Sequence, residues 1–382
     1  NKPMKSSLHN FRKGTNEHIA GPKPVNDSEA QLVICFGSKS MLSDESETER
    51  IASKFPNADV VYCTTSGEIF NDSVVDNAIV ATAIAFEKST FKLAETNIED
   101  YSNSHEAALN LIKTLPREDL VNVIVLSDGN RVNGSELIKG LNQGVDGKVL
   151  VTGGLAGDGV DFKSTLVGLN SHPKEGQIVA IGFYGNSLHV SHGSMGGWET
   201  FGPEREVTKS IGNVLYEIDG KSALELYKTY LGDEARNLPS SALLFPLSMI
   251  NNELSQPVVR TILSISEEDG SMTFAGDIPT GSQVRFMKAN FDKLTSAAGD
   301  AAQQTVGKNN IKPDLAILIS CVGRKLILGP RTEEEVEAVR ELYGEGTLLS
   351  GFYSYGEISP LKDELACNFH NQTMTITSFH EL

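Results

Sequence analysis

Residues 32–37 read Leu-Val-Ile-Cys-Phe-Gly, and this short apolar run opens the unit that decides the fold. An uncharged run of this length predicts a buried strand. Residues 45–55 follow with apolar side chains at helical spacing, and residues 58–63 form a second apolar run. That run leads into Thr64-Thr65-Ser66-Gly67-Glu68-Ile69. The order of strand, helix, strand, glycine and acid predicts a β-α-β unit.

The same order returns near the C-terminus. Residues 315–321 predict a strand, and residues 333–343 predict a helix with a capping box formed by Thr332 and Glu335. Residues 347–351 predict a further strand, which leads into Tyr355-Gly356-Glu357. Because both ends of the chain carry the same pattern, the sequence contains an internal repeat.

A third copy lies between these two. Residues 121–126 and 148–152 predict strands, residues 135–141 predict a helix, and the copy ends in Gly157-Asp158. Each unit predicts two parallel strands joined by a right-handed crossover. The apolar segments between the units predict additional antiparallel strands; they are residues 78–86, 178–184, 259–264 and 373–379.

These patterns predict an α/β protein with mixed sheets, built from repeated β-α-β units in two related, tightly packed halves. We expect a boundary near Gly220, after residues 213–219, and since no long linker marks it, the halves are expected to pack tightly. The expected parts are a flexible N-terminal arm (1–30), an N-terminal module (31–220) and a C-terminal module (221–382).

Charge and composition exclude several classes of function. The 382 residues contain 33 Lys and Arg against 50 Asp and Glu, a net charge of −17. Nucleic acids and anionic membranes attract cationic surfaces, so neither is an expected partner. No apolar run approaches the roughly 20 residues that cross a bilayer. Four cysteines without a CxxC pair, and a polar N-terminus without a secretory signal, favour the cytoplasm.

The acidic loops at the strand ends are the candidate functional sites, because ligands of open α/β sheets bind beyond the carboxyl ends of strands. Packing two halves face to face predicts a ligand cleft between them. The candidate ligand-binding residues are Thr65, Gly67 and Glu68 on one side, Arg324, Tyr353, Tyr355 and Glu357 on the other, and Gly154 and Asp158 on the floor.

Two interpretations of these residues stay open. Arg324 can bind a ligand carboxylate through two parallel hydrogen bonds, or it can neutralise Glu357 within a loop. The acids Glu68, Asp158 and Glu357 can bind a ligand, or they can accept hydrogen bonds that fix their own turns. Cys35 and Cys321 end two related strands, which favours packing over ligation for both thiols.

Several separate blocks of the sequence form a recognisable series. The N-terminal blocks are residues 63–69, 153–159 with Phe162 and Thr165, and 212–220, and the C-terminal blocks are 223–227, 320–324, 351–358 and 370–373. Together they resemble the FIST family of intracellular signal-transduction sensors. The blocks occur in order over residues 31–382, as an N-terminal and a C-terminal FIST module. The resemblance implies a cytoplasmic, bacterial sensor of a small ligand, for which amino acids or their derivatives are proposed.

Stand-alone members of this family include haem-binding, nitric-oxide-responsive proteins that act on a histidine kinase. The resemblance therefore implies haem b as a cofactor and a histidine kinase or a cyclic-dinucleotide enzyme as a partner. His192 is then the expected haem ligand, because it precedes a Gly-rich loop that contains Trp198. Two other classes stay open: an enzyme that processes small molecules with the Gly-Glu and Gly-Asp carboxylates, and an interaction module without a cleft.

Overall fold

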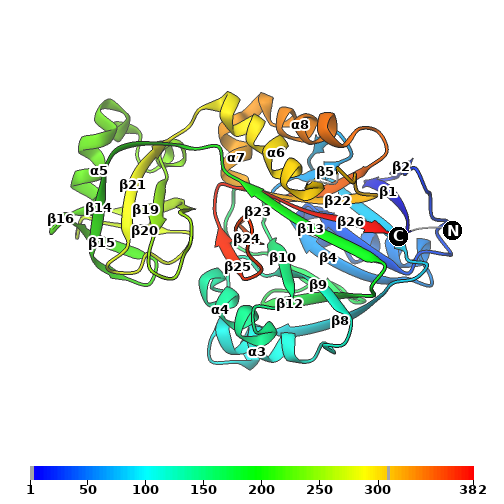
Figure 1. Ribbon diagram of the computed structural model, residues 1–382. Coiled ribbons are helices and arrows are strands. Elements are labelled where there is room, and N and C mark those ends of the chain that lie inside the picture. Colours follow the sequence, from blue (N-terminus) through cyan, green and yellow to red (C-terminus); the bar gives the residue numbers. More distant parts are fainter. Residues whose placement is uncertain (1–3, 308–309) are drawn as a thin grey trace.

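The computed structural model describes residues 4–307 and 310–382. Three consecutive repeats of the same strand order build the main body, and a smaller unit is inserted into the third repeat (Figure 1). Each repeat contains an outer strand, a parallel strand pair with a helix between its members, an edge segment and a returning strand.

The first repeat contains β1 (Lys5–Arg12), β2 (Thr15–Ala20), β3 (Leu32–Gly37), α1 (Lys39–Leu42), α2 (Glu45–Lys54), β4 (Asp59–Thr64), β5 (Glu68–Phe70), β6 (Ser73–Val75) and β7 (Ile79–Ala85). The second contains β8 (Thr90–Asn97), η1 (Ile98–Asp100), α3 (Ser104–Lys113), β9 (Leu120–Ser127), α4 (Gly134–Val145), β10 (Leu150–Leu155), β11 (Val167–Leu169) and β12 (Gln177–Tyr184). The third contains β13 (Leu188–Met195), α6 (Phe291–Val306), β22 (Leu315–Cys321), α7 (Val322–Leu328), η4 (Gly329–Arg331), α8 (Glu333–Tyr343), β23 (Leu348–Ser354), β24 (Gly356–Pro360), β25 (Cys367–His370) and β26 (Met374–Glu381).

The inserted unit lies between β13 and α6 and forms a separate sheet. It contains β14 (Glu199–Ile211), β15 (Val214–Ile218), β16 (Lys221–Ser222), α5 (Ala223–Leu231), η2 (Gly232–Asn237), η3 (Ser240–Leu244), β17 (Leu247–Ile250), β18 (Val258–Arg260), β19 (Ile262–Ser266), β20 (Ser271–Phe274) and β21 (Gln283–Lys288). A core of its own holds it together, with Tyr227 of α5 and Phe286 of β21 buried inside.

The three predicted β-α-β units are confirmed. Strands β3 and β4 pair in parallel, as do β9 with β10 and β22 with β23, and a helix connects the strands of each pair. The prediction of mixed α/β sheets is also correct, because β7, β12 and β26 return antiparallel to β3, β9 and β22.

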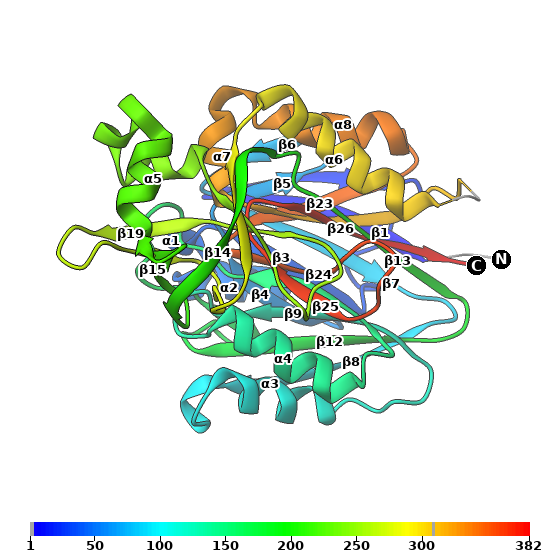
Figure 2. The ribbon, with the colours of Figure 1, turned by 60° about the vertical axis from the view of Figure 1, so that its left-hand side comes forward.

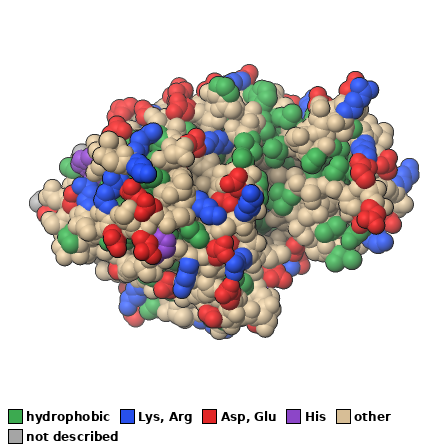
Figure 3. Space-filling model, turned by 180° about the vertical axis from the view of Figure 1, so that it is seen from behind, with side chains coloured by type: hydrophobic (Ala, Val, Ile, Leu, Met, Phe, Trp, Pro, Cys, Tyr) green, Lys and Arg blue, Asp and Glu red, His purple; other side chains and the backbone are tan. Residues whose placement is uncertain are grey.

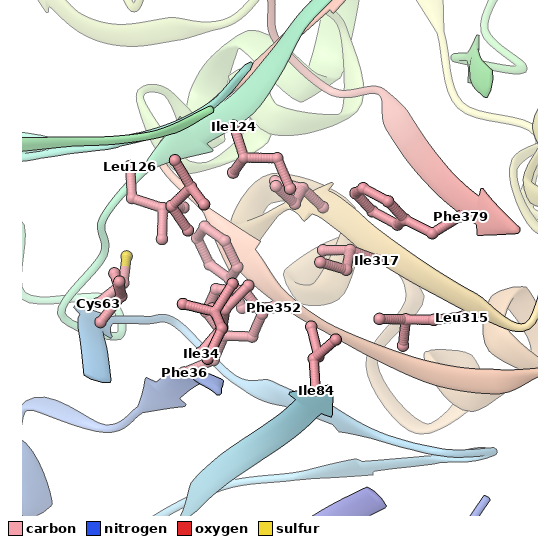
Figure 4. Packing of buried hydrophobic residues seen from close by; sticks show 14 of the residues in the cluster. Ile34, Phe36, Cys63, Ile84, Ile124, Leu126, Leu315, Ile317, Phe352 and Phe379 are labelled. Atoms are coloured by element: carbon pink, nitrogen blue, oxygen red, sulfur yellow. The ribbon is translucent and has the colours of Figure 1, made fainter. Parts of the chain in front are cut away.

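The expectation of two related halves is wrong, because three sheets share one core. Apolar side chains from all three sheets meet in it, including Phe36, Leu126 and Phe352 (Figure 4). Helices cover the outer faces: α2 packs on the first sheet, α3 and α4 on the second, and α6 and α8 on the third (Figure 2).

The sheets also exchange edge segments in a cycle. The hairpin β5–β6 of the first repeat pairs with β23 of the third, and β24–β25 of the third pairs with β10 of the second. Strand β11 of the second repeat pairs with β4 of the first. Each parallel pair therefore has its free edge covered by the next repeat, which protects it from pairing with other chains.

Strand pairing occurs at two places where the sequence predicted an arm or a boundary. Residues 5–20, expected in a flexible arm, form β1 and β2, and β1 pairs with β7 inside the first sheet. Gly220, the expected boundary between the halves, lies in the turn between β15 and β16, which pair with each other. The structure therefore does not divide at that residue.

Two glycines allow the parallel pairs to approach closely. Gly351 has φ 157° and Gly153 has φ 142°. A Cβ atom would lie 1.8 Å from the carbonyl oxygen of Leu318 at the first position and 1.9 Å from that of Val125 at the second. Because these neighbours are backbone atoms of the partner strands, the clash cannot be relieved by a change of rotamer.

We expect Gly351→Ala to lower the free energy of unfolding by about 2 kcal/mol or more, since a strand would have to move. Gly153→Ala should do the same. Gly346→Ala is the control, because no atom lies within 4 Å of its added Cβ. Urea unfolding measures all three, and wild-type stability of Gly351→Ala would contradict the close approach.

Candidate functional site

The loops that follow the three parallel pairs are joined by backbone hydrogen bonds. Each loop donates one amide to a carbonyl of another repeat: Ser66 N to Tyr353 O at 2.8 Å, Tyr355 N to Leu155 O at 3.2 Å, and Gly157 N to Thr64 O at 2.9 Å. The bonds form a closed cycle of three. The carboxyl ends of all three strand pairs are therefore held together at one end of the body.

A cavity lies beyond each of these strand ends. The open pocket, about 740 Å³, follows β3 and β4 and is lined by residues 38–40, 43, 65–68, 76–77, 158–159 and 161. The polar bay, about 510 Å³, follows β9 and β10 and is lined by residues 129–134, 155, 162–163, 213, 263, 274–277 and 355. The apolar cleft, about 420 Å³, follows β22 and β23 and is lined by residues 162, 239–240, 243, 261–263, 275, 321–323, 326, 355 and 371.

The apolar cleft lies where the inserted unit meets the body. Leu243 and Leu263 line it from the inserted unit, and Val322, Leu326 and Tyr355 line it from the body. Hydrophobic side chains gather around the hollow between the two parts in Figure 3. Its volume lies within the range of about 300–1,000 Å³ that is usual for small-molecule sites.

An aromatic pair forms one wall that the apolar cleft shares with the polar bay. The rings of Phe162 and Tyr355 stack with centroids 4.4 Å apart and an interplanar angle of 14°. Phe162 has φ 52°, an uncommon conformation for a bulky residue. Its amide donates to Tyr355 Oη at 3.2 Å, and the tyrosine hydroxyl donates to Asp158. These contacts hold the ring of Phe162 in the cleft, where it is 48% exposed.

Asp158 fixes the loop that carries this aromatic pair. Burial alone would raise the pKa of its carboxyl, but hydrogen bonds from Tyr355 and from the amides of Ser164 and Lys163 lower it below its ordinary value. Both amides lie 2.9 Å from Oδ2. The carboxylate is therefore engaged within the loop, although it also borders the open pocket.

A buried hydroxyl without a partner lies at the apolar cleft. Thr261 is 5% exposed, and its Oγ1 has no hydrogen-bond partner among the described residues. Its amide donates to Asn371 Oδ1 at 3.2 Å, which fixes the backbone at this position. Because buried polar groups normally find partners, this hydroxyl is available to bond to a water molecule or to another molecule in the cleft.

Two protein-family models together match most of the chain. A family model described as FIST N domain matches residues 31–221, and one described as FIST C domain matches residues 223–360. The chain belongs to the FIST family. The resemblance seen in the sequence is confirmed, and with it a role in sensing within signal transduction. The two FIST matches meet within the inserted unit, between β16 and α5.

Comparisons with individual proteins add little. No curated protein matches the FIST chain. Among solved structures, it is similar to the crystal structure of cyanuric acid hydrolase from A. caulinodans, with 7% identity over 98% of this chain and 99% of that chain. The TM-score is 0.36, and no argument about this protein follows from a likeness at that level.

The FIST block that contains Arg324 has a structural role, contrary to the expected binding of a ligand carboxylate. Arg324 is fully buried. Its guanidinium donates to the carbonyls of Gly196, Gln372 and Leu294 and pairs with Glu335 at 3.0 Å. Since Nε also donates to Glu335, every N–H of the guanidinium is occupied and none is left for a ligand.

Glu335 is therefore the partner of Arg324 rather than part of a capping box. Its carboxylate also accepts from Ser320 Oγ at 3.0 Å and from Tyr353 Oη at 2.8 Å. Thr332 makes no side-chain cap. Tyr353 is fully buried in this network, so it is not available to a ligand either.

Glu68 and Glu357 follow the parallel strand pairs of the first and third repeats, and each accepts a hydrogen bond within its own loop. Thr65 Oγ1 donates to Glu68 Oε1 at 2.5 Å and accepts from the amide of Gly67 at 3.3 Å. Ser354 makes the same pair of contacts, donating to Glu357 at 2.9 Å and accepting from the amide of Gly356 at 3.2 Å. Both glutamates are fully buried. This geometry agrees with the turn-fixing interpretation.

The predicted site residues therefore do not converge on one cleft. Thr65, Gly67, Glu68 and Asp158 border the open pocket, and Tyr355 borders the apolar cleft and the polar bay. Gly154, Arg324, Tyr353 and Glu357 border none of these cavities. Among the described residues, those expected in one cleft lie at separate strand ends, because each of the three repeats forms a strand end of its own.

The expected haem ligand lies away from the cavities. His192 pairs with Thr377 across β13 and β26, and burial lowers its pKa. Its Nδ1 is buried without a partner, but it borders neither the three strand-end cavities nor a fourth cavity of about 290 Å³ beside α4. No histidine lines these four cavities, so their residues do not fit a histidine-ligated haem. The described residues also hold no cluster of three or more His, Cys, Asp or Glu suited to a metal ion.

Apart from Tyr355, sequence reasoning did not assign the residues that line the apolar cleft to a site. Phe162 and Asn371 belong to FIST blocks, so the resemblance gave a signal for them. Thr261 and Leu263 lie in the inserted unit and carry no motif. Cys321 was assigned to packing, and it is buried, but it also lines the cleft.

The buried glutamates predict a decrease in stability with rising pH. Burial raises the pKa of both Glu68 and Glu357 to about 8. The folded chain therefore holds these protons at pH values where the unfolded chain releases them, and stability falls as pH rises from about 4.3 to 8. Buried His9 and His370, whose pKa values are lowered to about 4, act in the opposite direction below pH 6.5.

We expect Glu357→Gln to gain stability relative to wild type by about 1 kcal/mol per pH unit between pH 6.5 and 8. Glu68→Gln should behave alike. Urea unfolding at several pH values measures the difference, and exposed Glu337→Gln is the control. A difference that does not change with pH would show that the glutamate is ionised in the folded protein.

We also expect His192→Ala to leave hemin titrations unchanged, because His192 lines none of the four cavities described above. The Soret absorbance of wild type and variant measures the effect. A Soret band that is present in the wild type and lost in folded His192→Ala would restore His192 as the ligand.

Proposed function

We propose that this FIST protein senses a small organic ligand bound in the apolar cleft. The observation that carries the proposal is the buried, unpaired hydroxyl of Thr261 at a cavity with apolar walls. The strand ends at the same place support it, since ligands of α/β proteins bind there. The ligand therefore contacts the inserted unit and the body at the same time.

A ligand in this position favours one arrangement of the two parts. The inserted unit joins the body through two short connections, residues 196–198 and 289–290. A molecule that contacts both parts binds best to the arrangement in which both walls are close, and it shifts the population toward that arrangement. Sensing then requires no chemical step.

Arg324 links the cleft to these connections. Val322 and Gly323 line the cleft, and the next residue binds the carbonyl of Gly196 in the first connection. Its guanidinium also binds the carbonyl of Leu294 at 2.6 Å, shortly after the second connection. A shift of α7 on ligand binding thus reaches both connections through one side chain.

The signal passes to a separate partner in the cytoplasm. The family resemblance favours a histidine kinase, or a cyclic-dinucleotide enzyme, as that partner. No helix among the described residues is long and apolar enough to cross a membrane. A sensor is favoured over an enzyme because the candidate acids are separated. Glu357 borders none of the cavities described above, Asp158 is engaged within its loop, and Glu68 borders the open pocket but accepts a hydrogen bond from Thr65.

Binding of Nile red, a neutral dye that fluoresces in apolar sites, tests the proposed cleft. We expect Leu263→Asp to lower the affinity for the dye at least about tenfold, because it places a charge in an apolar wall. Leu365→Asp is the matched control: Leu263 is 49% exposed and Leu365 is 51% exposed, and Leu365 does not line the cleft. Wild-type affinity in Leu263→Asp, or an equal loss in both variants, would reject the cleft as the site.

A further inference from the structure

We infer that the ligand of the apolar cleft is an uncharged, flat molecule with one hydrogen-bonding group, in the class of aromatic alcohols, ketones and amides. The inference rests on the proposed function and adds the chemistry of the ligand. It departs from the amino-acid and haem ligands that the family resemblance implied, both of which carry ionised groups.

The absence of charge in the walls is the first argument. Of the described residues, those that line the cleft include no Asp, Glu, Lys, Arg or His. Cys321 and Tyr355 can titrate, but burial raises the pKa of the Cys321 thiol to about 12 and the pKa of Tyr355 above its ordinary value. Both are neutral at pH 7. An ionised ligand would lose its water here without gaining an opposite charge.

The nearest cations cannot substitute for a counter-charge in the cleft. Arg324 lies behind Gly323, but its N–H groups are all occupied by Glu335 and three carbonyls. In the adjoining polar bay, Arg131 already pairs with Glu99 and Glu175, and Lys163 lines that bay but not the cleft. An amino acid would therefore leave its carboxylate and ammonium unpaired in this cleft.

The aromatic pair is the argument for a flat molecule. The ring of Phe162 stacks on Tyr355 and lines the cleft. The backbone of Phe162 has φ 52°. Such a backbone conformation persists only where neighbouring contacts hold it, and it is commonly found at ligand sites. Leu326 and Leu263 line the same cleft, and these residues are 44% and 49% exposed. A planar ring fits this set of walls because it can stack on an aromatic face and contact the leucines with its edges.

Thr261 is the argument for one hydrogen-bonding group. Its hydroxyl can donate and accept, and it has no partner. The buried side-chain amide of Asn371 is partly engaged, since Oδ1 accepts from Thr261 N and one N–H of Nδ2 donates to His370 O. A single alcohol, carbonyl or amide group of the ligand satisfies Thr261.

Three probes of nearly equal shape test the charge: naphthylmethanol, naphthoate and naphthylmethylammonium. Their displacement of Nile red is measured on the full chain. We expect the neutral alcohol to displace the dye with an apparent affinity at least about tenfold higher than either ion. Equal displacement by all three, or preference for an ion, would overturn the inference.

Two further comparisons test shape and hydrogen bonding. The saturated decalin analogue of naphthylmethanol should bind several-fold more weakly, and Phe162→Leu should remove that difference. Thr261→Val should weaken naphthylmethanol about tenfold while leaving Nile red unchanged. Thr90→Val, at an exposed position of β8, is the control. No preference for the flat probe, or no effect of Thr261→Val, would contradict the corresponding part of the inference.

The outcomes separate this inference from the function it rests on. If Nile red binds in a manner that depends on Leu263 and all three probes displace it equally, the cleft is a ligand site and the inferred ligand class is wrong. If Leu263→Asp does not affect dye binding, the proposed function fails and the inference fails with it.

Discussion

The cyclic exchange of edge segments among three repeats is the constraint on which the rest of the structure depends. Each parallel pair lends its following segment to the sheet of another repeat, through β5, β11 and β24. The three backbone hydrogen bonds between the loops close the same cycle at the strand ends. Because the three sheets then face one core, all carboxyl ends emerge together, and the cavities lie side by side.

The inserted unit makes one of these strand ends different from the others. It covers the ends of β22 and β23 and shares the apolar cleft with the body, whereas the end of β3 and β4 stays open and polar. The buried pair of Arg324 and Glu335 holds the inserted unit in place through backbone carbonyls. A buried ion pair contributes little net stability on average, but it is costly to break. Its value here lies in fixing the geometry of the connections.

The sequence predicted the local units well and their assembly poorly. Strand and helix periodicity depend on neighbouring residues, so β22 and α8 were predicted with the bounds that the structure shows. The pairing of β5 with β23 joins residues about 280 positions apart, and no local pattern encodes it. Strand β1 was missed because polar Ser7, His9 and Asn10 are buried in it, which made the segment resemble a solvated arm.

For the candidate site residues as well, the local pattern was predicted and the tertiary surroundings were not. Thr65, Glu68 and Glu357 were recognised as related, and the structure gives them related hydrogen bonds. Their exposure could not be predicted, because it depends on which repeat covers them. Arg324 was assigned to a ligand because it follows the carboxyl end of a strand, and its actual partner, Glu335, was assigned to a helix cap. The cleft itself is formed by Phe162, Thr261 and Leu326, which only the tertiary fold brings together.

The cyclic exchange also has a consequence for biosynthesis. While the ribosome is still making the second repeat, β5 has left the exit tunnel, but its partner β23 does not yet exist. The edge of the first sheet is completed by β11, but the cycle closes only after β24, which ends at Pro360, has been translated. Contacts of such high sequence separation form late and slowly. Until then, nascent chains carry exposed strand edges that chaperones can recognise.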